Sequence, residues 1–171
     1  MQSNIIIRLI CAVLIASAGA FTGHSISCAE SRRAVLLAET MDSLQILRIH
    51  MLESLLPLNT AFCRAGGYIL TAAGELMKGI SAGEAWHELC STQCTRGQKL
   101  DSLTAADKEA LNRFFIYLGK TAREEQAKNF ETTLKELGIL ENAARQDSLR
   151  KRKLFTSLGT LAGTAVAIAF L

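Results

Sequence analysis

The sequence predicts an all-α membrane protein, in which a cytoplasmic antiparallel helical bundle lies between an N-terminal and a C-terminal transmembrane helix. Three observations support this prediction. Both ends of the 171-residue chain are apolar. All 16 acidic residues and 18 of the 19 basic residues lie between Glu30 and Lys153. This middle segment is dominated by Leu, Ala, Glu, Lys and Arg, contains the single proline, Pro57, and shows no strand pattern.

These patterns divide the chain into three parts. Residues 1–29 contain the N-terminal apolar segment (about 5–23) and a short connector, residues 30–153 form the helical domain, and residues 154–171 form the C-terminal span. The middle part is long enough for one domain but not for two. Its small net positive charge is not clustered, which gives no support to nucleic-acid binding.

The N-terminal apolar segment has two possible interpretations. As a retained span it runs from Ile5 to about Phe21, with Arg8 near one end, where the long side chain can reach the interface. As a cleaved signal peptide it would end at Ala18-Gly19-Ala20, which fits the A-x-A cleavage pattern. The basic residues that follow it, Arg32 and Arg33, favour a retained span with the next segment in the cytoplasm.

The C-terminal apolar segment has the clearer topology. Residues 154–171 carry no charge and, at about 1.5 Å per residue, nearly cross a ~30 Å hydrocarbon core. A basic run directly precedes them: Arg150, Lys151, Arg152 and Lys153. Such a run marks the cytoplasmic side, so we expect both termini outside and the domain inside. Gly159 and Gly163 form a G-x-x-x-G that would let two helices approach closely, although glycine is also common in membrane helices.

The first half of the domain predicts three helices. Apolar residues at three- and four-residue steps mark the first helix, which ends before Pro57: Leu37, Met41, Leu44, Leu47, Met51 and Leu55. A second helix begins at Asn59 or Thr60, continues through Gly66-Gly67 and ends near Gly79. A short third helix opens with a capping box at Ser81–Glu84 and carries Trp86 on its apolar side.

The second half predicts a loop and two further helices. The polar stretch Thr95–Ser102 predicts a loop. After it, Thr104 is expected to cap a helix that ends near Gly119. Another capping box, Thr121–Glu124, opens a long final helix. This helix either continues into the membrane segment or breaks at Gly138 or near Asp147.

No residue pattern indicates catalysis, so we expect a protein that is not an enzyme and has no cofactor. The histidines His24, His50 and His87 belong to no recognisable catalytic or metal motif. The best metal candidates are His87, Cys90 and Cys94, which share one side of a helix, with Cys63 as a possible fourth ligand. Free cysteines are also common small residues of helical cores. The odd cysteine count, five, indicates reduced thiols rather than a disulfide framework.

The order of these features resembles the stage III sporulation protein AB family. The matching residues are spread over nearly the whole chain: Arg33, Leu52-Glu53, Pro57-Leu58, Ala61, Gly83–Trp86, Leu103-Thr104, Asp107, Leu118-Gly119, Gln126, Lys153-Leu154-Phe155, Leu158-Gly159 and Gly163. The chain departs from the family between Leu52 and Pro57, where a Tyr and a Thr are usual, and at Cys90–Lys99.

The resemblance implies a structural role in a secretion-related, channel-like complex between mother cell and forespore. Family members are similar to the platform component of type II secretion and type IV pilus systems. The cytoplasmic domain would lie on the mother-cell side of the membrane around the forespore. It would dock a secretion-type ATPase of the same operon and contact other membrane proteins of the complex. The docking candidates are Glu53 and Gln126, whereas the basic run Arg150–Lys153 is better explained by topology.

Two other functions stay open at this point. One is a secreted, tail-anchored helical binding protein, which requires cleavage near Ala20. The other is a membrane-bound metal or thiol sensor built from Cys63, His87, Cys90 and Cys94.

Overall fold

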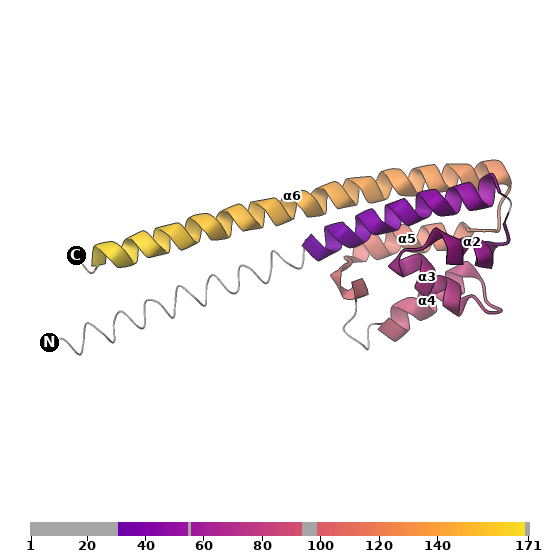
Figure 1. The fold of residues 1–171 in the computed structure, drawn as a ribbon, viewed down its shortest axis with the longest axis horizontal. Coiled ribbons are helices and arrows are strands. Elements are labelled where there is room, and N and C mark those ends of the chain that lie inside the picture. Colours follow the sequence, from indigo (N-terminus) through magenta and orange to yellow (C-terminus); the bar gives the residue numbers. More distant parts are fainter. Residues whose placement is uncertain (1–30, 55, 94–98, 170–171) are drawn as a thin grey trace. The chain divides into compact units, whose positions relative to one another are not determined.

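The computed structural model describes residues 31–54, 56–93 and 99–169, and every regular element in them is a helix. The all-α class is therefore confirmed for this part of the chain. Residues Arg32–Ala143 form one compact unit, and the rest of the last helix belongs to a second. The elements follow the chain in this order: a helix at residues 31–52, α2 (Leu58–Ala65), α3 (Tyr68–Leu76), α4 (Ala82–Gln93), the 3₁₀ helix η1 (Lys99–Ser102), α5 (Ala105–Tyr117) and α6 (Arg123–Ala169) (Figure 1).

Within the compact unit, the 31–52 helix and the beginning of α6 lie side by side (Figure 1). They run antiparallel, because the Arg123 guanidinium at the start of α6 donates a hydrogen bond to the Leu52 carbonyl at the end of the 31–52 helix. Further along, a Cβ added at Gly138 would lie 3.6 Å from Cε of Met41. α6 is assigned as one helix from Arg123 to Ala169, so it shows no break at Gly138 or near Asp147.

The core of the compact unit is built around aromatic rings. The Trp86 ring stacks on Phe115, with centroids 5.1 Å apart and an interplanar angle of 7°. Phe114 meets Phe115 and Phe130 edge-on, at 5.6 and 5.0 Å, and Phe62 lies 6.0 Å from Phe115. These rings come from α2, α4, α5 and α6, so four helices converge on one cluster.

The stretch after Pro57 forms two helices, which corrects the single helix expected there. Gly66 and Gly67 both have positive φ, 67° and 76°, and they separate α2 from α3. A Cβ at Gly67 would lie 1.9 Å from Oγ and 2.9 Å from Cβ of Ser43, so only glycine fits this close approach to the 31–52 helix. The backbone N–H of Tyr68 then donates to Oε1 of Glu39 at 2.9 Å, which satisfies the first residue of α3.

The helix starts were predicted with mixed success. The Ser81–Glu84 box forms: the Ser81 N–H donates to Oε2 of Glu84 at 2.8 Å, and the Glu84 N–H donates to Oγ of Ser81 at 3.3 Å. Thr104 caps α5 as expected. The expected box at Thr121 is replaced by another arrangement, because α6 begins at Arg123 and the Thr121 hydroxyl accepts a hydrogen bond from Gln126.

Other predictions for this region are only partly covered. The end of the predicted polar loop forms η1, with Leu100 buried, while residues 94–98 lie outside the described residues. Among the described residues, no helix combines the length and the apolarity that a membrane span requires. The N-terminal segment at about 5–23 and residues 170–171 also lie outside that part.

Candidate functional site: a groove between α5 and α6

A shallow groove opens between the end of α5 and the first turns of α6. It is lined by Tyr117, Thr121, Glu125, Lys128, Asn129 and Thr132. The four lining residues from α6 recur at three- and four-residue steps and so form one stripe on that helix. Tyr117 faces them from α5 and is 56% exposed. Tyrosine is one of the residue types enriched at protein–protein contacts.

Gln126 supports the groove by joining the end of α5 to the start of α6. This residue is only 4% exposed, and its Nε2 donates to the Tyr117 carbonyl at 2.8 Å and to Oγ1 of Thr121 at 2.7 Å. Between these two partners the chain reverses at Gly119, which has φ 75°. Gln126 therefore fixes the end of α5 against the start of α6. This placement corrects the docking expectation for Gln126, because its side chain has almost no surface to offer a partner.

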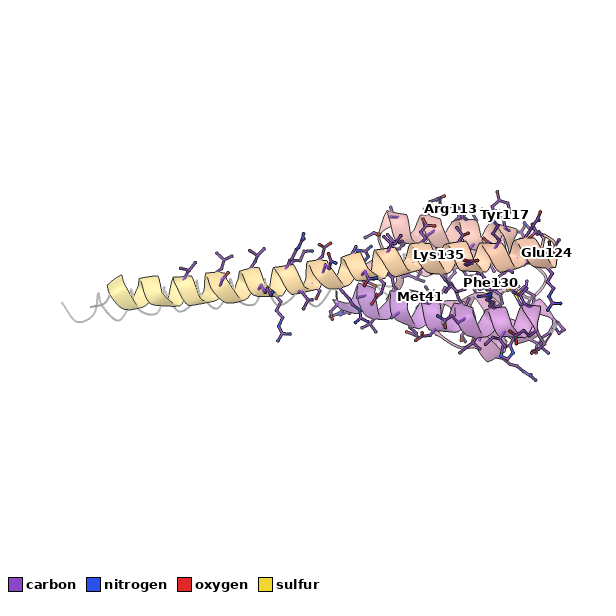
Figure 2. All side chains as sticks on the ribbon, turned by 90° about the horizontal axis from the view of Figure 1, so that it is seen from above. Met41, Arg113, Tyr117, Glu124, Phe130 and Lys135 are labelled. Carbon is purple, nitrogen blue, oxygen red and sulfur yellow. The ribbon has the colours of Figure 1, made fainter. Side chains whose placement is uncertain are left out.

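Two ion pairs involve residues of α5 and α6. Arg113 of α5 pairs with Glu136 of α6, and Lys135 pairs with Glu131 one turn earlier at 2.7 Å. Figure 2 shows Arg113 and Tyr117 on α5, with Lys135 on the neighbouring α6. These pairs are exposed, and exposed ion pairs add little stability.

The start of α5 is anchored by a buried ion pair. Nε and Nη2 of Arg33 donate to Oδ2 and Oδ1 of Asp107 at 2.7 and 2.8 Å. Asp107 also accepts a hydrogen bond from the Thr104 N–H at 2.8 Å, and its own N–H donates to Oγ1 of Thr104 at 3.4 Å. One carboxylate thus closes the capping box of α5 and ties α5 to the 31–52 helix.

Asp107 is held in its charged form by these contacts. Burial raises the pKa of its carboxyl, but the hydrogen bonds from Arg33 and Thr104 outweigh burial and leave the pKa below its usual value. The pairing also corrects the expectation that Arg33, like Arg32, serves as a flanking charge. Arg32 is exposed, whereas Arg33 is 8% exposed and belongs to the core.

Glu53, the other docking candidate, is exposed. Its N–H donates to the Ile49 carbonyl at 2.9 Å, so the helical hydrogen-bond pattern continues through Glu53 at the end of the 31–52 helix. The adjacent Leu52 carbonyl accepts the hydrogen bond from Arg123. Glu53 therefore stays accessible to a partner, on a helix that does not line the groove.

The candidate metal ligands are only partly described. On α4, His87 is exposed and Cys90 is half-buried against the core, while Cys94 lies outside the described residues. Cys63 is an exposed free thiol on α2, with Sγ 4.0 Å from Oδ1 of Asn59. Among the described residues, no group of three or more His, Cys, Asp and Glu side chains is placed to hold a metal ion.

The residues expected at the membrane boundary lie within α6. The run Arg150–Lys153 is helical, with Arg150, Arg152 and Lys153 exposed. Gly159 and Gly163 are also part of α6, and their packing stays a prediction.

Sequence reasoning missed the groove and the Arg33–Asp107 pair. The Thr104-x-x-Asp107 spacing is itself a capping-box pattern, with Asp in the place of Glu. The ion pair between Arg33 and Asp107 joins residues 74 positions apart, and no local sequence pattern predicts such a contact. The groove depends in the same way on how two helices pack.

Comparison with known proteins identifies the family. No curated protein and no solved structure gives a significant match to the chain. The profile of the stage III sporulation protein AB family matches residues 8–171, nearly the whole sequence. The chain therefore belongs to the stage III sporulation protein AB family.

Proposed function

We propose that this protein is a membrane-anchored, non-catalytic adaptor of a sporulation complex, and that its α5–α6 groove docks the secretion-type ATPase of the same operon. Membership of a stage III sporulation family supports a role in sporulation. The apolar ends and the basic run Arg150–Lys153 support two spans around a cytoplasmic domain on the mother-cell side. Contacts with other membrane proteins of the complex belong to the same proposal.

The observation that carries the docking proposal is the exposure of Tyr117 at the groove. A tyrosine brings a large, rigid contact area to a partner, and such residues often dominate the binding energy of an interface. The buried contacts of Gln126 fix the backbone at Tyr117, so the groove is formed before a partner arrives. Preformed surfaces lose less entropy on binding.

Co-purification with the ATPase tests the proposal. Membranes containing the full-length chain are solubilised, and the ATPase recovered with it is quantified for the native chain and for Tyr117→Ala. We expect recovery to fall by at least about tenfold, the effect of losing an interface residue worth roughly 1.4 kcal/mol or more. Lys128→Glu, which reverses a charge in the groove, should also weaken recovery.

The matched control is Ile139→Ser. Ile139 is an exposed apolar residue of α6, 71% exposed, and does not line the groove. Its substitution should leave ATPase recovery unchanged. All variants should keep the native fold, which Trp86 fluorescence verifies. Normal recovery with Tyr117→Ala would contradict docking at the groove. Glu53→Lys in the same assay tests whether the ATPase instead uses the end of the 31–52 helix.

A further inference from the structure

The outward face of the 31–52 helix carries an apolar stripe that no described residue covers. In the compact unit, five large hydrophobic side chains are exposed among the described residues, and three of them lie on this helix: Val35 (65% exposed), Ile46 (41%) and Ile49 (47%). The other two, Tyr117 and Ile139, lie on separate helices. The stripe is therefore the main apolar surface of the unit.

The spacing places these residues on one line together with two acids. Positions 35, 42, 46, 49 and 53 differ by seven, four, three and four residues, which keeps them on one face over about five helical turns. Asp42 lies in the middle of the stripe and Glu53 at its end, and both are exposed. The opposite face of the helix carries the buried core residues Leu37, Leu44 and Leu47. The 31–52 helix thus has a second apolar face, which is interrupted by one negative charge.

The position of Asp42 limits what can cover the stripe. Two copies of this chain would pair through a two-fold axis. Asp42 lies midway between Val35 and Ile49, so pairing the stripe with itself over the whole length from 35 to 49 brings two Asp42 carboxylates together in either the parallel or the antiparallel arrangement. Like charges opposed within an apolar contact are unfavourable. An anionic lipid surface would meet Asp42 and Glu53 with the same repulsion.

We propose that this stripe packs against a helix of a different protein, whose facing side is apolar and carries a Lys or Arg opposite Asp42. An amphipathic partner helix would bury Val35, Ile46 and Ile49 and neutralise Asp42 in one contact. The stripe and the groove lie on different helices, so this inference does not rest on the ATPase docking at the groove.

Site-specific photocrosslinking in sporulating cells tests the inference. A benzoylphenylalanine replaces Ile46 in the full-length chain, and the crosslinked residue of the partner is identified by mass spectrometry. The control places the same group at Thr71, an exposed position of α3 that belongs to neither the stripe nor the groove. We expect a crosslink at position 46 that exceeds the control and maps to a helix with a Lys or Arg on the same face.

Charge reversal then tests the recognition itself. Asp42→Lys should lower the crosslink yield about fivefold, the order expected when a favourable ion pair becomes a like-charge pair, and converting the partner's cation to Glu should restore the yield. Asp42 is exposed, so the fold should survive, which Trp86 fluorescence verifies. A crosslink to a second copy of this chain, a yield no higher than at position 71, or a yield insensitive to Asp42→Lys would each overturn the inference.

Discussion

Replacing Asp107 with alanine should destabilise the helical domain far more than replacing an acidic residue on its surface. The Asp107 side chain is fully buried and is bound by two nitrogens of Arg33. Removing it leaves the guanidinium of Arg33, which is also buried, without this partner, and breaking one side of a buried ion pair costs about 3–5 kcal/mol. The Thr104 N–H also loses its acceptor in the α5 capping box, and losing a capping hydrogen bond costs about 1 kcal/mol in typical helices. We therefore expect the free energy of unfolding to fall by about 4–6 kcal/mol.

Denaturant unfolding of the solubilised full-length chain measures this loss. Trp86 is the single tryptophan and stacks on Phe115 in the core, so its fluorescence reports the unfolding of the compact unit. The control is Asp101→Ala, which removes an exposed carboxylate on η1 and should change stability by less than about 0.5 kcal/mol. A loss of about 1 kcal/mol or less for Asp107→Ala would show that only the cap matters, and would refute the role given to the ion pair.

The same carboxylate predicts a pH dependence. The pKa of Asp107 is lowered in the folded state, so the unfolded chain binds this proton more readily than the folded one. Its contribution to stability is complete above the unfolded pKa of about 3.9 and is lost as pH falls through the lower folded value. Asp107→Asn should therefore flatten the fall in stability below about pH 4, measured by Trp86 fluorescence during acid titration. An unchanged acid transition would contradict the pairing.

Three further substitutions test how the helices are joined. Gly66→Ala should lower the free energy of unfolding by about 1–3 kcal/mol, because an alanine is strained at a positive φ. Gly67→Ala should lower it further, because the added Cβ would also collide with Ser43. Equal losses in denaturant unfolding would show that the approach to Ser43 is unimportant. Gln126→Leu should lower the free energy of unfolding by about 1–3 kcal/mol, since the hydrogen bonds from Gln126 to the Tyr117 carbonyl and to the Thr121 hydroxyl are both lost. It should also reduce ATPase recovery, because the groove loses its support, and full recovery with normal stability would contradict that role.

Local patterns were sufficient to predict most of the helices. The three- and four-residue spacing of Leu37, Leu44 and Leu47 identified a buried face correctly, because helical periodicity is a property of the sequence alone. The caps at Ser81 and Thr104 were predicted for the same reason, since each depends on a side chain three residues from its partner. The continuity of α6 was left open, because a single glycine at position 138 costs too little to decide it.

The errors arose where distant residues decide the structure. The sequence allowed a helix through Gly66-Gly67, but both residues have positive φ and Gly67 lies against Ser43, so the helix breaks between α2 and α3. Arg33 resembles a topology signal because it follows Arg32, yet it is buried in an ion pair with Asp107, 74 residues away. Gln126 was matched through the family pattern, which marked it as important but could not tell a buried support from an exposed docking residue. Tyr117 had no distinguishing local pattern at all.

Hydrogen–deuterium exchange of the full-length chain, with and without the ATPase, tests the central claim most directly. The proposed docking at the groove predicts slower exchange around Tyr117 and the first turns of α6, residues 117–132, when the ATPase is bound. Exchange in α4, which contributes no residue to the groove, should stay unchanged. Protection confined to α4 or to the 31–52 helix, with none in residues 117–132, would contradict docking at the α5–α6 groove.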